Sequence, residues 1–356
     1  MHDVRTPGAR PLRQRIRWRA VGIALSLAVI ALAFFVLYRI LHDIEPREVL
    51  TAMRQVEGGD LLLAALCVAG AYFTLTFYDY FALKTIGRRE IPYRTAALAA
   101  FTSYSIGHNV GLSAFSGGAV RYRVYAASGL TGIEVAKICA VAGLTFWLGN
   151  VTVLGLGVAF DPSAASAIDR LPTPLNRGFG ILILAALVVY VCWVSMAERR
   201  LGTDEWMVRL PGGRLTLLQI LIGIADLVFA TAAMYVLMPD RPNIDFISLL
   251  VVFVSATLLG FASHSPGGLG VFDAAMLIGL RQFDKEDLVG ALLLFRLLYY
   301  VTPFAISLVI IGVRELTIDL PWLSQKMRPH GDALDAGTEK PKSAARETHK
   351  REDGIR

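Results

Sequence analysis

The chain has 356 residues, of which 55% are hydrophobic and only 18% are charged, and its formal net charge is +6. This composition is typical of a polytopic membrane protein. The positive charge does not indicate nucleic-acid binding, because lysine and arginine concentrate beside the apolar stretches. A disulfide framework or metal site is not expected, because Cys67, Cys139 and Cys192 all lie within apolar stretches and suit small buried hydrophobes.

A basic segment, residues 1–19, precedes the first predicted span, Ala20–Tyr38. About 20 apolar residues cross the hydrocarbon core, and basic flanks favour the cytoplasmic side. The N-terminus is therefore predicted to be cytoplasmic. No small-residue cleavage site follows this span, so we expect no cleavable signal peptide. The following external segment has room for a short interfacial helix over Pro46–Arg54.

Five further spans are predicted from apolar length, with directions set by their flanking charges. Basic residues place residues 84–94 and 198–214 in the cytoplasm, whereas residues 161–177 and 239–245 are predicted to be external. Residues 20–318 then form the membrane domain, and residues 319–356 a polar, disordered cytoplasmic tail. The five spans are Asp60–Leu83, Ile138–Phe160, Gly178–Ala197, Leu215–Met238 and Leu288–Val313.

Two other apolar stretches, Thr95–Val120 and Phe246–Phe272, are interrupted by glycine, histidine or proline. The interruptions are Gly107–Gly111 with Ser116–Gly118, and Ser263–Gly270. Breaks of this kind free backbone groups that lipid cannot satisfy, so they survive at membrane depth only where protein or water covers them. We therefore expect two re-entrant helical hairpins, the first entering from the cytoplasm and the second from outside.

These elements predict an all-α integral membrane protein with about six full spans and two re-entrant hairpins in an inverted repeat. Residues 60–160 and 215–313 would be the two halves, joined by the span Gly178–Ala197. Broken segments in corresponding places of two halves indicate a transporter's substrate site. The alternative is two unrelated bundles whose glycines permit close helix packing.

Ionisable residues inside apolar spans are functional hypotheses, since an unpaired charge is unfavourable there. Asp226 and Arg296 lie deepest, and we expect them to pair with each other. Asp273 follows the second break, where it either caps a half-helix or binds a ligand or ion.

The first half offers a second set of candidates. Asp79 either contributes to a substrate site or pairs with Lys84 and Arg88 at the interface. Arg121 suits a phosphate head group, because guanidinium binds phosphate bidentately. His108 and His264 lie at the two breaks, where histidine either hydrogen-bonds freed backbone groups or relays protons.

Sequence templates for catalysis are not found: neither a P-loop, nor Gly-x-Ser-x-Gly, nor His-Glu-x-x-His occurs. We therefore expect no metal, no cofactor and no catalytic residues, so that an enzyme is the less favoured class. Transport without an ATP-binding domain would be facilitated or ion-coupled.

The segment Ser265–Ala274 resembles the Pro-Gly-Gly-Leu-Gly-Val-x-(Glu/Asp)-Ala signature of the lysylphosphatidylglycerol synthase transmembrane-region family. Phe295–Phe304, with its Arg and Pro, resembles the family's following span. Tyr78-Asp79-Tyr80 and Asn109 with Ser116–Arg121 resemble its earlier elements. The resemblance covers about residues 61–313, and the Pro-Gly-Gly-Leu-Gly motif is its most specific part.

In the two-domain multiple peptide resistance factors, this region resembles a lipid flippase module that precedes an aminoacyl transferase domain. Here the chain ends soon after Val313, so we expect that domain and its activity to be missing. The resemblance implies movement of a lipid or lipid-linked substrate between leaflets. The alternatives are a catalytic or non-catalytic partner in lipid head-group modification, such as aminoacyl-phosphatidylglycerol metabolism, and a scaffold.

We therefore expect a bacterial inner-membrane protein with cytoplasmic termini, whose partners are the membrane and a phospholipid or lipid-linked substrate. A homo-oligomer or a separate synthase remains possible as a further partner, and nucleic acid is excluded. The predicted substrate site comprises Asp79, Asn109, Arg121, Asp226, Pro266, Gly267, Gly268, Asp273 and Arg296.

Overall fold

The computed structural model describes residues 47, 51, 56–111, 113–202, 207–263 and 266–326. The expected span Ala20–Tyr38, most of the expected interfacial helix, His264 and the tail beyond residue 326 lie outside the described residues. The contacts form one compact unit as far as Ile311, and the arrangement described below is that of this unit.

Five long apolar helices match the five spans expected within the described part of the chain. Each is long enough to cross a membrane, so the all-helical membrane class is confirmed. The last span is not one regular helix, because a five-residue π turn, Leu297–Val301, joins its two parts. The helices are α3 (Gly58–Thr85), α6 (Gly132–Phe160), α8 (Thr173–Met196), α9 (Gly213–Leu237), and α12 (Lys285–Arg296) continuing into α13 (Thr302–Lys326).

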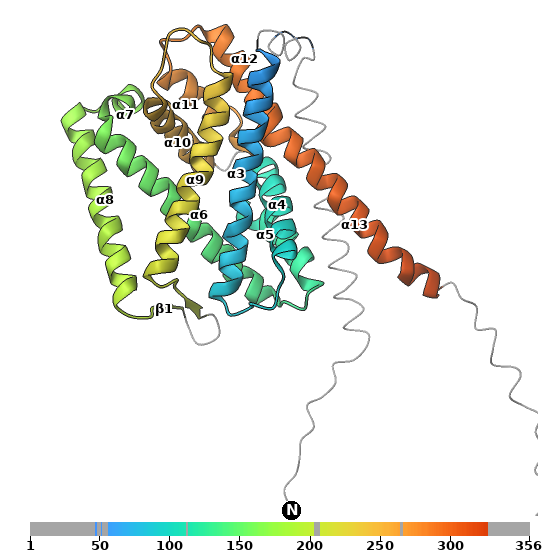
Figure 1. The fold of residues 1–356 in the computed structure, drawn as a ribbon. Helices are drawn as coiled ribbons and strands as arrows, with labels where there is room; N and C mark the ends of the chain where they lie inside the picture. Colours follow the sequence, from blue (N-terminus) through green and yellow to red (C-terminus); the bar gives the residue numbers. More distant parts are fainter. Residues whose placement is uncertain are drawn as a thin grey trace, which may run out of the picture. The chain divides into compact units, whose positions relative to one another are not determined.

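Both interrupted stretches form pairs of shorter helices. The first pair is α4 (Tyr93–Val110) and α5 (Ser113–Ala126), which pack against each other. The second pair is α10 (Phe246–Ala262) and α11 (Val271–Gly279), separated by a 3-10 turn, Pro266–Gly268. Figure 1 shows α10 and α11 in the upper half of the bundle and α4 and α5 in the lower half.

Several boundaries differ from expectation. Helix α6 begins at Gly132 because Thr131 and Glu134 form a reciprocal capping box, with the Glu134 carboxylate accepting from the Thr131 N–H at 2.8 Å. The predicted external and cytoplasmic segments contain a short helix, α7 (Pro162–Asp169), and a small antiparallel pair, β1 (Arg200–Leu201) and β2 (Val208–Arg209). Helix α13 continues to Lys326, so the predicted tail from residue 319 begins as helix.

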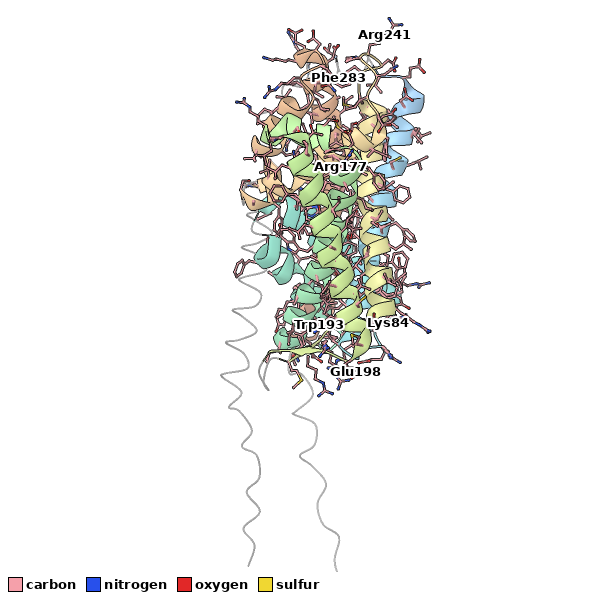
Figure 2. All side chains as sticks on the ribbon, turned by 90° about the vertical axis from the view of Figure 1, so that its left-hand side faces the viewer. Lys84, Arg177, Trp193, Glu198, Arg241 and Phe283 are labelled. Carbon is pink, nitrogen blue, oxygen red and sulfur yellow. The ribbon has the colours of Figure 1, made fainter. Side chains whose placement is uncertain are left out.

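The connecting segments gather at two opposite ends of the bundle. Lys84, Trp193 and Glu198 lie at one end in Figure 2, whereas Arg241 and Phe283 lie at the other. Residues 84–94 and 198–214, which are predicted to be cytoplasmic, therefore lie at one end, and the predicted external segment 239–245 lies at the other.

Helices α6 and α9 cross at two glycines that let their backbones touch. A Cβ built on Gly149 would lie 2.6 Å from the Gly223 Cα, and a Cβ on Gly223 would lie 2.7 Å from the Gly149 Cα. Small residues permit such close crossings in membranes, where van der Waals packing drives helix association. Beside this crossing, Phe229 of α9 packs on Gly70 of α3, so α9 is held between two helices.

We predict that Gly149→Ala lowers the thermal unfolding midpoint of the detergent-solubilised protein, because the added methyl group would force α6 and α9 apart. Gly143→Ala on the same helix is the matched control, since nothing lies within 4 Å of a Cβ at that position. Equal midpoints for the two variants would contradict the close crossing.

Candidate functional site

The first helix break lies at Gly111, whose φ of +81° favours glycine. Its carbonyl accepts from the Ser116 hydroxyl at 2.9 Å. Asn109, 1% exposed, donates from its amide nitrogen to the carbonyls of Ser105 at 2.8 Å and Tyr300 at 3.1 Å. Side chains thus satisfy backbone groups at the break, as required inside a membrane.

The second break is built from three glycines with positive φ: Gly267 at +61°, Gly268 at +62° and Gly270 at +80°. The carbonyl of Gly267 accepts from Nη1 of Arg296 at 3.4 Å. The N–H of Gly270 donates to the Asp273 carboxylate at 3.0 Å, so Asp273 caps the start of α11. Pro266, which begins the turn, is exposed.

The two breaks meet inside the bundle. A Cβ on Gly267 would lie 3.9 Å from the carbonyl oxygen of His108 and 3.8 Å from Nη1 of Arg296. The π turn also contacts the first break, since Asn109 donates to Tyr300. The predicted site residues of the first and second stretches are therefore neighbours in space.

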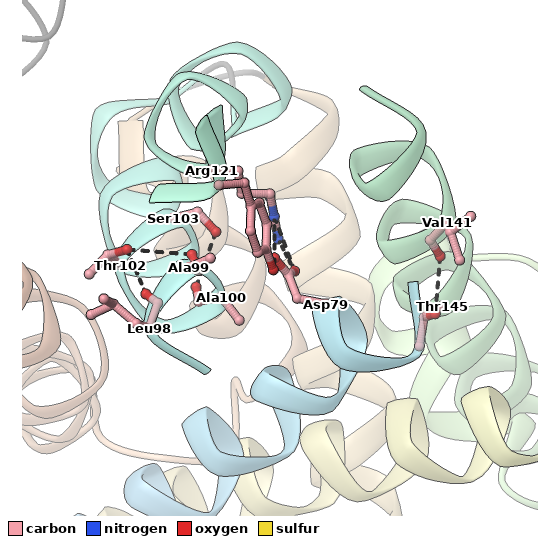
Figure 3. Close-up of polar contacts among 10 residues, drawn as sticks. Asp79, Leu98, Ala99, Ala100, Thr102, Ser103, Arg121, Val141 and Thr145 are labelled. Atoms are coloured by element: carbon pink, nitrogen blue, oxygen red, sulfur yellow. Dashed lines mark hydrogen bonds and ion pairs between the residues drawn. The ribbon is translucent and has the colours of Figure 1, made fainter. Parts of the chain in front are cut away.

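Asp79 and Arg121 form a buried ion pair between α3 and α5, shown in Figure 3. Nε of Arg121 lies 3.1 and 3.0 Å from the two carboxylate oxygens of Asp79, and Nη2 lies 2.9 Å from Oδ1. The Tyr125 hydroxyl donates to Oδ2 of Asp79 at 2.9 Å. Asp79 is 0% and Arg121 5% exposed, so the pair is closed to solvent in this arrangement.

Asp273 and Arg296 form the second pair, and it is less deeply buried. Nε of Arg296 donates to Oδ1 of Asp273 at 2.9 Å, and Nη2 donates to Oδ2. The side chains are 26% and 11% exposed, respectively. Asp273 therefore caps a helix and neutralises an arginine at the same time.

The expected pair between Asp226 and Arg296 is wrong, because Arg296 projects from the end of α12 onto α11 rather than onto α9. Asp226 instead accepts from the Tyr78 hydroxyl at 3.2 Å. The interfacial alternative for Asp79 is also wrong. Lys84 lies over the Tyr80 ring, 4.1 Å from its centroid, and Arg88 pairs with Glu90 and Glu134.

An aromatic bridge of Tyr104, His108 and Tyr300 connects the two ion pairs, and the sequence interpretation missed the two tyrosines. Tyr104 lies beneath Arg121, with 4.6 Å between Cζ and the ring centroid, and its ring centroid is 5.7 Å from that of His108. His108 lies 6.5 Å from Tyr300, over which Arg296 is placed at 5.8 Å. A sequence signal existed for one of these contacts, because Tyr104 and His108 are four residues apart on a helix.

The arrangement is an electrically neutral polar layer of two Arg–Asp pairs with an aromatic bridge. An open groove on the outer face of α9 is separate and includes none of the nine predicted residues. Its lining residues are Arg214, Leu217, Leu218, Ile220, Leu221 and Ile224.

We predict that Asp79→Asn and Arg121→Gln each destabilise the protein by about 3–5 kcal/mol, because removing one partner leaves a buried, uncompensated charge. The double variant should recover part of that loss. The measurement is thermal or denaturant unfolding in detergent, with exposed Asp240→Asn as the control. Strictly additive losses would show that the pair is not coupled.

Comparison with known proteins agrees with the motifs. The model of the lysylphosphatidylglycerol synthase TM region matches residues 20–307. An uncharacterised protein of Synechocystis is 30% identical over 246 residues, covering 69% of this chain and 76% of that protein. The inner membrane protein YbhN of Escherichia coli is 27% identical over 300 residues, covering 82% and 92%.

Larger relatives match through only part of their length. The phosphatidylglycerol lysyltransferase of Staphylococcus haemolyticus is 23% identical over 301 residues, which are 80% of this chain but 32% of that enzyme. The chain is thus a multi-pass membrane module related to part of these enzymes. Its helices, motifs and matched range together show that it belongs to the lysylphosphatidylglycerol synthase transmembrane-region family.

Proposed function

We propose that this protein is a flippase-like transporter that moves a phospholipid, or a lipid-linked substrate, between the leaflets of the bacterial inner membrane. The observation that carries the proposal is the meeting of two broken helical pairs, one from each end of the bundle, at a polar layer that contains Arg121 and Arg296. Discontinuous helices that meet inside a bundle are a recurrent way to build a transporter's substrate site. The description of YbhN as an inner membrane protein supports the location.

An inverted repeat is consistent with the order of the elements. The first half is α3, the α4–α5 hairpin and α6, and the second is α9, the α10–α11 hairpin and the broken last span. Helix α8 lies between the halves in sequence and provides the odd crossing that inverts the second half. Two opposed re-entrant hairpins give a bundle that can open to either side in turn.

The polar layer suits a lipid whose head group contains both a phosphate and an amine. Arginine binds phosphate through two parallel N–H groups, and each arginine here is already held by a carboxylate in that manner. A head group that contains a phosphate and an amine can therefore replace one ion pair with two new ones, phosphate to arginine and amine to aspartate. A zwitterionic head group leaves the net charge of the layer unchanged.

The lysyltransferase relatives favour a second candidate function, a membrane partner in head-group modification. That role needs lipid access from one side only, whereas transport needs access from both. Lipid movement by the purified protein alone would separate the two.

We predict that the hairpins open toward opposite faces. In a background without Cys67, Cys139 and Cys192, Arg94→Cys should react with an impermeant thiol reagent from the cytoplasm and Arg281→Cys from outside. This prediction rests on the basic residues that flank the first hairpin and on the placement of the two helical pairs toward opposite ends of the bundle. Reaction of both cysteines from the same face of the membrane would contradict the inverted repeat.

We predict that Arg121→Lys and Arg296→Lys each reduce transport strongly, because lysine keeps the charge but loses the planar fork that binds phosphate. The assay follows phosphatidylethanolamine in proteoliposomes through reaction of outer-leaflet amines with an impermeant reagent. Arg209→Lys, at the exposed residue of β2, is the control, and unfolding is measured in parallel. Full transport by both stable variants would contradict the site.

A further inference from the structure

Asp226 of α9 differs from the other acidic residues of the polar layer. It is 5% exposed, and its Oδ2 accepts from the Tyr78 hydroxyl at 3.2 Å. Its Oδ1 has no hydrogen-bond partner within the described residues. Asp79 and Asp273, by contrast, each bind an arginine through both oxygens.

The surroundings of Asp226 contain no compensating cation in the part of the chain that the structure describes. The ionisable side chains that interact electrostatically with it are phenols: Tyr72 and Tyr78 of α3, Tyr104 of α4 and Tyr299 of the π turn. The Thr74 hydroxyl of α3 is also close to Asp226, but it donates to the Ala71 carbonyl at 2.6 Å. On α6, which also packs on α9, the Thr145 hydroxyl accepts from the Gln219 side chain at 2.8 Å. Helix α10 presents apolar side chains to Leu227, the residue next to Asp226.

A carboxylate with one hydrogen bond and no cation is strongly disfavoured in a buried site, whereas a protonated carboxyl group is tolerated. We propose that Asp226 is a proton-binding site of the transport cycle. It holds a proton in the closed arrangement described above and releases it to water when the surrounding helices separate. This inference rests on the proposed transport function and names the ion to which transport is coupled.

A chain of contacts leads from Asp226 to the phosphate-binding group. The Tyr78 ring packs edge-on against Tyr104, with 5.8 Å between centroids and 87° between the ring planes. Tyr104 in turn supports the guanidinium of Arg121 from below. When Asp226 loses its proton, the hydrogen bond from the Tyr78 hydroxyl becomes stronger and draws the Tyr78 ring toward Asp226. Tyr104, which packs on Tyr78 and lies beneath Arg121, shifts with it.

Infrared spectroscopy tests the proton site without any transport assay. The wild-type protein in nanodiscs at neutral pH should show the C=O stretch of a protonated carboxyl group that Asp226→Asn lacks. Asn is close in shape and still accepts from Tyr78, so the fold should survive. Exposed Asp240→Asn should keep the band. Identical wild-type and Asp226→Asn spectra would overturn the proposal, whether or not the protein transports lipid.

The proteoliposome assay with phosphatidylethanolamine tests the coupling. The wild-type rate should depend on pH and respond to an imposed proton gradient, whereas Asp226→Asn should lose both responses, whatever rate it retains. Retention of both responses in the variant would overturn the coupling. Complete loss of transport with unchanged stability would also overturn it, because Asp226 would then be a ligand of the lipid amine.

Discussion

Backbone groups in a lipid environment must find partners within the protein, and this constraint governs the centre of the molecule. Within the described part of the chain, helix breaks in the apolar stretches lie at Gly111, around Pro266–Gly268 and at the π turn before Pro303. Proline has no N–H, so the Tyr299 carbonyl four residues earlier loses its helical donor. The Tyr72 hydroxyl of α3 donates to it at 3.0 Å instead.

The Asn109 side chain also donates to the π turn, at the Tyr300 carbonyl. At the other two breaks, Ser116 donates to the carbonyl of Gly111 and Arg296 to that of Gly267. These side chains come from different helices, so each break is stable only while its neighbours are in place. The helix breaks, the contact between the two hairpins and the positions of these side chains therefore depend on one another. A change in any one break would be transmitted to the others, and under the proposed function this coupling would link the two hairpins during transport.

Like the backbone groups, the buried charges are compensated by partners inside the protein. The Arg121–Asp79 and Arg296–Asp273 pairs neutralise the polar layer, and the aromatic bridge of Tyr104, His108 and Tyr300 separates them. Guanidinium groups over aromatic rings gain a further favourable contact. The described arrangement is closed, because Arg121 and Asp79 are almost fully buried. Under the proposed function, substrate reaches them only after the hairpins separate.

The amino-acid sequence alone determined the membrane class and the number of described spans. It also determined the two interruptions, because apolar length, basic flanks and glycine clusters act locally. It identified Asp79, Arg121, Asp273 and Arg296 as candidate site residues, since ionisable residues stand out in or beside apolar stretches. The family motif around residues 265–274 was likewise legible.

Only the tertiary structure decided which charges meet. Arg296 could reach either Asp226 or Asp273 by sequence position, and the direction in which α12 ends selects Asp273. Asp79 lies near Lys84 and Arg88 in sequence, yet its partner is 42 residues away, because hairpin packing brings α5 onto α3. For the same reason, Asp226 has no cationic partner among the described residues. Helix periodicity fixes which face a side chain occupies, but pairing depends on how separate helices cross, and that is set by packing across the whole bundle.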